Sequence, residues 1–153
     1  MSLISHYING AVVAAPDSGR LGVFNPASGL AIAQVELADQ SLVDQAVAAA
    51  KAAWPAWSET APLRRARVMF KFKELLEQNQ QKLAAIITRE HGKIFSDAMG
   101  EVTRGIEVVE FACGLPQLLK TQFSDNIGGG IDQWNIRQSL GVTVGITPFN
   151  FPF

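Results

Sequence analysis

The sequence predicts an α/β protein in which short edge strands and helices lead into the first strand of a parallel sheet. The apolar spacing changes from two over residues 6–36 to about 3.6 over residues 41–113. Residues 141–147 are β-branched, almost uncharged and followed by Pro148, as in a strand buried on both faces of a parallel sheet. A parallel partner requires a crossover, and no other segment fits that role. We therefore expect the sheet to be incomplete in this chain.

Short strands are expected before the helices. Residues 6–13 predict a tight hairpin, because Asn9 and Gly10 tolerate the positive φ angles of a two-residue turn. Residues 22–29 predict a strand end that runs into a turn rich in Pro, Ser and Gly. Residues 31–36 alternate weakly, and we expect an edge strand there.

Capping residues and prolines set the expected limits of the first two helices. Ser41–Asp44 has the spacing of a capping box, and the alanine-rich helix that it opens is expected to end before Pro55. Pro62 suits the first position of the next helix, and Gly92 suits its C-terminal cap. The polar residues 78–81 either join two helices or lie within one.

A further helix is expected from Ser96 or Asp97 to about Cys113, with apolar residues on two sides. One side follows the spacing of a buried face and comprises Val102, Ile106, Val109 and Cys113. The other comprises Val108, Phe111 and Leu115. Gly100 and Gly105 each cost up to about 1 kcal/mol against alanine in a helix interior, so we expect another backbone to approach them closely. The helix is therefore expected to pack on both sides.

The composition excludes several classes of protein. The 13 Lys and Arg residues balance 14 Asp and Glu residues, and no basic stripe suits nucleic acid or an anionic membrane. With 48% hydrophobic and 18% charged residues, the chain is not globally disordered. No stretch reaches the roughly 18 apolar residues of a membrane span, and the N-terminus lacks a signal-peptide pattern. We expect a cytoplasmic protein without a disulfide or a metal site, since Cys113 is the single cysteine.

The residues alone leave two candidate sites open. Cys113 lies on a core stripe and His91 at a helix end, so neither is nominated as a nucleophile or base. Arg104 either forms a surface ion pair with Glu101 or Glu107, which the residues alone favour, or offers a desolvated fork to a carboxylate. Asn150 follows the buried strand, where it either closes a Pro-rich turn or donates to developing negative charge.

Motifs along nearly the whole chain resemble the aldehyde dehydrogenase superfamily. Residues 145–152, GITPFNFP, resemble the loop that ends the first strand of its nucleotide-binding domain. Four further features match in the same order, namely NPASG at 25–29, Trp57, RRAR at 64–67 and EHGK at 90–93. Residues 87–93 and 100–116 are similar to the CoA-acylating branch that acts on methylmalonate semialdehyde. The resemblance implies the N-terminal part of that fold, leading into a Rossmann-like sheet.

The resemblance also implies an activity and roles for particular residues. It implies oxidation of methylmalonate or malonate semialdehyde to propionyl-CoA or acetyl-CoA, with NAD as oxidant, CoA as acyl acceptor and loss of CO2. Asn150 would supply the amide of an oxyanion hole, Arg104 would hold the substrate carboxylate, and Phe151 would face the aldehyde channel. The NAD site would be lined, largely through backbone, by Ile146, Thr147, Pro148 and Phe149.

Domain limits and partners follow from the same resemblance. Residues 1–140 would hold the N-terminal strands, the helical region and the start of an oligomerisation strand, with a half-exposed strand over 133–140. Residues 141–153 would be the first strand and loop of a truncated NAD-binding domain. A dimer or tetramer of the full-length protein is expected. The family's nucleophilic cysteine and general-base glutamate would lie beyond Phe153, so this chain alone is expected to be inactive.

One departure and two alternatives remain. Ser139 stands where the branch usually has proline, which touches no chemistry. A CoA-independent semialdehyde dehydrogenase would share the fold and release an acid. A short non-catalytic oligomerisation or interaction subunit would belong to a different functional class.

Overall fold

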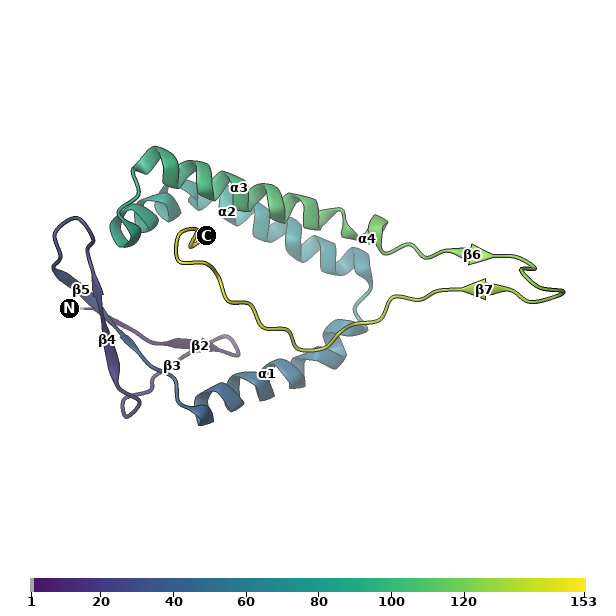
Figure 1. Cartoon of the computed structure of the whole chain (residues 1–153), viewed down its shortest axis with the longest axis horizontal. Coiled ribbons are helices and arrows are strands. Elements are labelled where there is room, and N and C mark those ends of the chain that lie inside the picture. Colours follow the sequence, from purple (N-terminus) through teal and green to yellow (C-terminus); the bar gives the residue numbers. More distant parts are fainter. Residues whose placement is uncertain (1) are drawn as a thin grey trace.

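The computed structural model describes residues 2–153 and combines small sheets, long helices and an extended C-terminal segment (Figure 1). Figure 1 shows strands β1–β5 at one end, the paired helices α2 and α3 along one side, and α1 along the other. The elements, in chain order, are β1 (Ser2–Ile4), β2 (His6–Ile8), β3 (Ala11–Val13), β4 (Arg20–Phe24), β5 (Ala31–Glu36), α1 (Gln40–Ser58), α2 (Pro62–His91), α3 (Phe95–Cys113), α4 (Leu115–Leu118), β6 (Phe123–Ser124) and β7 (Gln133–Trp134).

The N-terminal strands confirm the predicted hairpin and correct one strand position. β2 and β3 pair antiparallel across Asn9 and Gly10, whose φ angles are 51° and 78°. β5 is the central strand of the order β1-β5-β4, so the prediction of an edge strand at residues 31–36 is wrong. β1 pairs in parallel with the second side of β5. This partner was missed because β1 is too short to give an alternating pattern that sequence analysis could detect.

Helix α1 begins earlier than expected. The side chain of Asp39 caps it by accepting a hydrogen bond from the Leu42 amide at 2.8 Å. The predicted capping box at Ser41–Asp44 is therefore wrong by about half a turn, because the aspartate nearest the strand provides the cap instead.

Helix α1 also ends later than expected, because it continues through Pro55 to Ser58. Proline removes one N–H donor, but it lies so close to the C-terminal end that little of the helix follows it. The Ser58 hydroxyl and the Glu59 amide both donate to the Pro55 carbonyl, at 2.8 and 3.2 Å. These bonds close the last turn, so the prediction of a helix end before Pro55 is wrong.

Helix α2 is a single helix, and its predicted limits are confirmed. Pro62 is its first residue, and the polar residues 78–81 lie within it. Gly92 ends it in the left-handed region at φ 81°, with its amide donating to the Thr88 carbonyl at 3.0 Å. A Cβ at Gly92 would also lie 2.7 Å from Pro26 Cγ, so the turn after β4 packs against the end of this helix.

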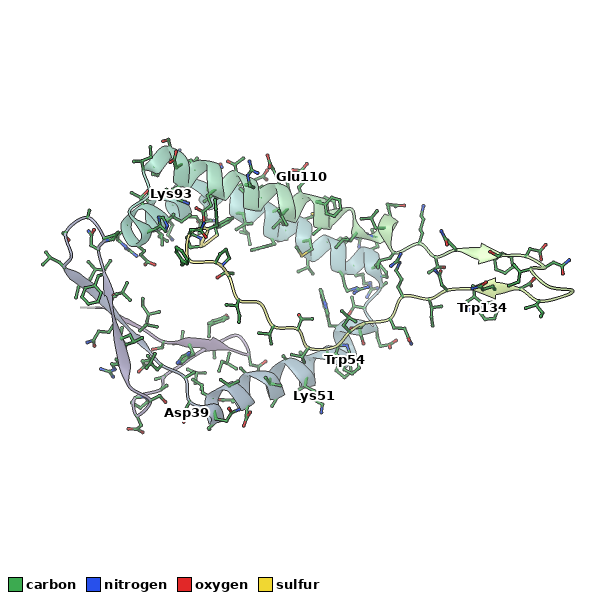
Figure 2. All side chains as sticks on the ribbon, viewed as in Figure 1. Asp39, Lys51, Trp54, Lys93, Glu110 and Trp134 are labelled. Atoms are coloured by element: carbon green, nitrogen blue, oxygen red, sulfur yellow. The ribbon has the colours of Figure 1, made fainter. Side chains whose placement is uncertain are left out.

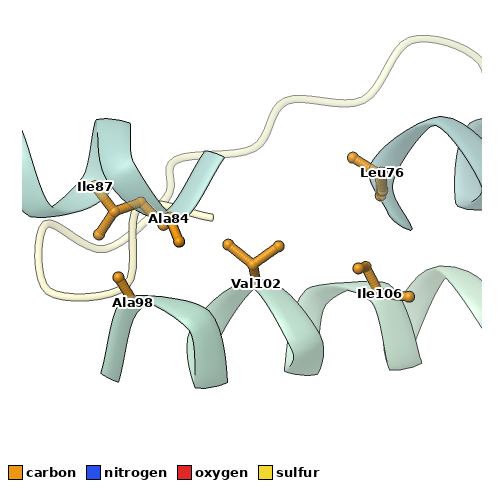
Figure 3. Packing of buried hydrophobic residues seen from close by; sticks show 6 residues of the cluster. All are labelled: Leu76, Ala84, Ile87, Ala98, Val102 and Ile106. Carbon is orange, nitrogen blue, oxygen red and sulfur yellow. The ribbon is translucent and has the colours of Figure 1, made fainter. Parts of the chain in front are cut away.

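Helices α2 and α3 share the main hydrophobic core (Figure 3). Figure 3 shows side chains from the two helices facing one another, and Val102 and Ala84 at their centre are fully buried. The cluster comprises Leu76, Ala84, Ile87, Ala98, Val102 and Ile106. The predicted stripe at 102, 106, 109 and 113 is thus confirmed as the packed face of α3.

The second apolar face of α3 is not covered by the residues that the structure describes. Val108 and Phe111 are 65% and 66% exposed, so the prediction that α3 packs on both sides is wrong for residues 2–153. The group that lies close to Gly105 is the ring of Phe153 and not a backbone. A Cβ at this position would overlap that ring. No other group lies within 4 Å of a Cβ at Gly100, so close packing does not explain this glycine.

The C-terminal segment contradicts two predicted strands. Only Gln133–Trp134 of the expected strand at 133–140 pairs, with Phe123–Ser124, in a ribbon that projects from the molecule (Figure 1). Residues 141–147 form no strand and run as an extended coil between α1 and the α2–α3 pair. A strand is defined by hydrogen bonds to a neighbour, and residues 2–153 offer this segment no neighbouring strand.

Candidate functional site

The C-terminal segment ends in a loop, residues 148–153, that turns back onto the start of α3 (Figure 1). The Phe151 amide donates to the Pro148 carbonyl at 3.4 Å, which closes a turn around Asn150. We call residues 148–153 the Asn150 loop.

A buried ion pair holds this loop. Lys93 follows the cap of α2, Glu101 lies on the second turn of α3, and their side chains are only 15% and 4% exposed. Lys93 Nζ and Glu101 Oε2 are 2.5 Å apart. Burial alone would raise the pKa of the Glu101 carboxyl, but hydrogen bonds from Lys93 and the Phe153 amide outweigh it and lower the pKa from its ordinary value. Glu101 is therefore a carboxylate at neutral pH.

Both members of the ion pair also bind the backbone of the Asn150 loop. Lys93 Nζ donates to the Asn150 carbonyl at 3.0 Å, and Glu101 Oε1 accepts from the Phe153 amide at 2.9 Å. The same ammonium lies 4.6 Å from the centre of the Phe151 ring, within the range of a cation–π contact. Figure 2 labels Lys93 where the C-terminal segment meets the helical pair.

Arg104 and Phe151, both predicted to contact substrate, border the same open depression of about 590 Å³. Arg104 is exposed and makes no ion pair within residues 2–153. The surface pair with Glu101 or Glu107 that the residues alone favoured is not formed, and Lys93 occupies the Glu101 carboxylate. The full lining is Lys93, Ser96, Asp97, Gly100, Glu101, Arg104 and Phe151.

Asn150 is exposed at the tip of its loop. Its backbone carbonyl accepts the hydrogen bond from Lys93, whereas its side-chain amide makes no hydrogen bond to any described residue. The backbone is thus held and the side-chain donor is left available. An amide that donates to an oxyanion requires this arrangement, since a donor already bonded within the protein could not reach a ligand.

The residues predicted to line a cofactor site are also exposed. Ile146 and Phe149 are 94% and 90% exposed, and residues 142–147 make no hydrogen bond within the described part of the chain. Phe149 borders a second depression, of about 330 Å³, on the α2 side of the loop. The lining of this depression is Leu83, Ile86, Ile87, Glu90, His91, Phe149, Pro152 and Phe153.

Sequence reasoning missed the groups that hold the segment in place. It offered Glu101 or Glu107 as the ion-pair partner of Arg104, although Val102, next to Glu101, is fully buried and marks the inward side of α3. It also assigned no partner to Ser139, whose Oγ accepts a hydrogen bond from Trp54 Nε1 at 2.7 Å. Pairs so far apart in the chain leave no local pattern that a sequence window could detect.

Two further expectations concern the role of Cys113 and the possibility of a membrane-crossing helix. Cys113 is buried, and its Sγ lies 3.4 Å from the Val109 carbonyl, which confirms a packing role. Among residues 2–153, none of the helices combines the length and the apolar character that a membrane crossing demands.

Comparison with known proteins finds relatives that share one name, malonate-semialdehyde dehydrogenase. The chain is 51% identical to the malonate-semialdehyde dehydrogenase of Pseudomonas aeruginosa, over 99% of this chain and 30% of the relative. It is 47% identical to malonate-semialdehyde dehydrogenase 2 of Bacillus anthracis, over 98% of this chain and 31% of the relative. The chain therefore spans about a third of the length of the curated relatives that it matches.

Solved structures agree with the sequence relatives. The methylmalonate-semialdehyde dehydrogenase of Oceanimonas doudoroffii superposes with a TM-score of 0.95 at 54% identity, over 99% of this chain and 31% of that chain. A Sinorhizobium meliloti protein assigned to the same activity, solved with NAD, gives a TM-score of 0.95 at 47% identity with the same coverage. These matches confirm the predicted α/β fold. The sequence model of the aldehyde dehydrogenase family matches residues 13–153, and the chain belongs to that family.

Proposed function

We propose that the chain is the N-terminal portion of an NAD-dependent, CoA-acylating semialdehyde dehydrogenase. Its substrates would be methylmalonate and malonate semialdehyde, converted to propionyl-CoA and acetyl-CoA with loss of CO2. The observation that carries the proposal is 51% identity, over nearly the whole chain, to a malonate-semialdehyde dehydrogenase. The chain covers 30% of that relative, so the activity is proposed for a longer protein that contains these residues.

The proposed reaction oxidises an aldehyde that carries a second, carboxylate group. When bound, NAD supplies the acceptor for the hydride that leaves the aldehyde carbon. The acyl group passes to the sulfur of CoA, whose thiol proton is released. The carboxylate departs as CO2, and a proton takes its place on carbon.

This chain supplies groups that bind and polarise the substrate. The Asn150 amide donates to the aldehyde oxygen as negative charge develops there. Arg104 holds the substrate carboxylate through its guanidinium fork, and Phe151 forms an apolar wall beside the aldehyde. Support for these roles comes from the unbonded Asn150 amide and from the depression that Arg104 and Phe151 share.

The residues assigned to the cofactor would act mainly through their backbone. Ile146, Thr147 and Pro148 are exposed on an extended segment, and Phe149 adds a ring to the same surface. These residues would hold NAD by peptide hydrogen bonds and apolar contact. Their fit rests on peptide groups that make no hydrogen bond within the described chain.

We also propose a cytoplasmic homo-oligomer, either a dimer or a tetramer. The support is the projecting β6–β7 ribbon, where Trp134 and Ile136 are each 67% exposed. Residues 134–140 would lie at the contact between subunits, because an exposed ribbon edge readily pairs with another chain.

Arg104 provides the first test, made in the full-length protein. Arg104→Ala should raise KM for a carboxylated aldehyde by about tenfold to a hundredfold, because a charge-assisted hydrogen bond is lost. KM for a neutral aldehyde of similar size should stay within about twofold. Arg67→Ala, on the exposed side of α2, is the matched control and should change neither value. Equal effects on both substrates would contradict the assignment.

Asn150 provides the second test. Asn150→Ala should lower kcat by about 10²–10³-fold, because its amide acts on charge that forms in the transition state. Single-turnover kinetics with the acylation step isolated would measure the effect. Asn150 would be removed from the oxyanion hole if that step kept its wild-type rate.

Product analysis separates the proposal from its alternatives. With CoA present, a CoA-acylating enzyme forms an acyl-CoA, whereas a CoA-independent enzyme forms the free acid at a rate that CoA does not change. A full-length protein that oxidises no semialdehyde would favour the non-catalytic subunit.

A further inference from the structure

We propose that Lys93 and Glu101 form a latch that positions the Asn150 loop for the reaction, an inference that rests on the proposed function. Neither residue contacts the reacting atoms in this proposal. Both act through the backbone on either side of Asn150, as positioning residues.

The contacts of the latch converge on the loop from two directions. Lys93 comes from the junction between α2 and α3, and Glu101 comes from the body of α3. The first binds the carbonyl of Asn150 itself, and the second binds the amide of Phe153. The loop is thus tied down at both ends of a four-residue stretch whose side chains remain exposed.

Because the ion pair is buried, it depends on the loop for one of its hydrogen bonds. A carboxylate that is 4% exposed needs a donor for each oxygen, because water cannot replace a missing one. Lys93 satisfies one oxygen of Glu101, and the Phe153 amide satisfies the other. Lifting the loop would remove the donor to Glu101 Oε1. The latch therefore favours the observed position of the loop.

Two further contacts hold the same stretch against the helices. The Phe151 ring lies against the Lys93 ammonium, and the Phe153 ring occupies the space that Gly105 leaves open. Phe151 also borders the Arg104 depression, so the latch sets one wall of the proposed substrate site. Precise placement of a donor requires such support, since the Asn150 amide has no bond of its own to fix it.

The test uses the full-length enzyme and two readouts. Lys93→Met removes the donor to Asn150, and Lys93→Arg keeps a cation. A double variant, Lys93→Met with Glu101→Gln, avoids leaving a buried unpaired carboxylate and keeps the test valid where the single variant fails to fold. Lys73→Met is the matched control, because Lys73 also pairs with glutamates, Glu77 and Glu110, but does not contact the loop.

The readouts are hydrogen–deuterium exchange of the Phe151 and Phe153 amides and steady-state kinetics. The Lys93→Met and double variants should exchange these amides at least about tenfold faster and lower kcat about tenfold. KM for a carboxylated aldehyde should rise less than in Arg104→Ala, since the guanidinium fork is intact. Lys93→Arg should recover part of kcat, and Lys73→Met should match the wild type in both readouts.

Three results would overturn the latch as a positioning device. These are unchanged loop exchange in the double variant, faster exchange with wild-type kcat, and an equal loss of kcat in Lys73→Met. The proposed function fails in a distinguishable way, when the wild-type enzyme itself oxidises no semialdehyde. The exchange of the loop amides then decides by itself whether Lys93 and Glu101 hold the loop.

Discussion

The α2–α3 pair and the C-terminal segment are both rich in apolar residues, yet only the helices bury some of theirs in a shared core. Val102 and Ala84 are fully buried between the two helices, whereas Val144 and Ile146 are 83% and 94% exposed. A helix satisfies its own backbone and needs only one apolar partner, which the other helix provides. A strand for a parallel sheet needs neighbours for its backbone as well as its side chains. The pair carries its partners within these residues, whereas the segment is tied down only at a few points.

The largest expected effect comes from breaking the helical pair. Val102→Asp places a charge in the core without a partner, and should lower the free energy of unfolding by more than about 3 kcal/mol. Val108→Asp is the matched control on the same helix, because Val108 is 65% exposed, and should change stability by less than about 0.5 kcal/mol. Urea unfolding followed by circular dichroism measures both. Similar losses in the two variants would mean that the two faces of α3 do not differ in burial.

An intermediate effect is expected at the two glycines within α3. Gly100→Ala should raise the free energy of unfolding by up to about 1 kcal/mol, because no group obstructs the new methyl group. Gly105→Ala should gain less or lose stability, because the methyl group would displace the Phe153 ring. The same unfolding experiment compares the two alanine variants. An equal gain at both positions would show that the ring does not pack on Gly105.

The smallest effect is expected at the other attachment of the segment. Trp54→Phe removes the 2.7 Å hydrogen bond to Ser139 and should cost about 0.5 kcal/mol, since the pair is exposed. Hydrogen exchange near residues 139–141 should accelerate. Trp57→Phe is the control, because the Trp57 indole makes no hydrogen bond to a described residue. Equal exchange in both variants would remove Trp54 from the attachments of the segment.

Sequence reasoning succeeded where a signal is local. Pro62 and Gly92 mark the limits of α2, because proline suits a first helical position and glycine the left-handed cap. It failed at Pro55, where nearby hydroxyl and amide donors close a final turn that a proline rule does not foresee. It also failed at residues 141–147, because a strand-like composition does not create the neighbour that a strand requires.

The candidate site could be predicted only in part. Arg104 and Phe151 were both expected to contact substrate, and they border the same depression. Their roles, and that of Asn150, remain predictions. Lys93 follows the end of α2 and pairs with Glu101 on α3. It also binds the backbone carbonyl of Asn150, which lies 57 positions further along the chain. No spacing rule connects such distant groups, because only the packing of α2 on α3 brings them together.

The glycine at the end of α2 has a consequence beyond stopping the helix. Its backbone conformation decides the direction in which the chain leaves, and the next residue is Lys93. Pro26 rests on the same glycine, so a side chain there would collide with the turn after β4 as well as strain the backbone. Gly92 thereby sets the position of the Lys93 ammonium group, and a substitution at Gly92 would first displace the backbone at Asn150. The residue that ends α2 therefore also determines where the Asn150 loop is held.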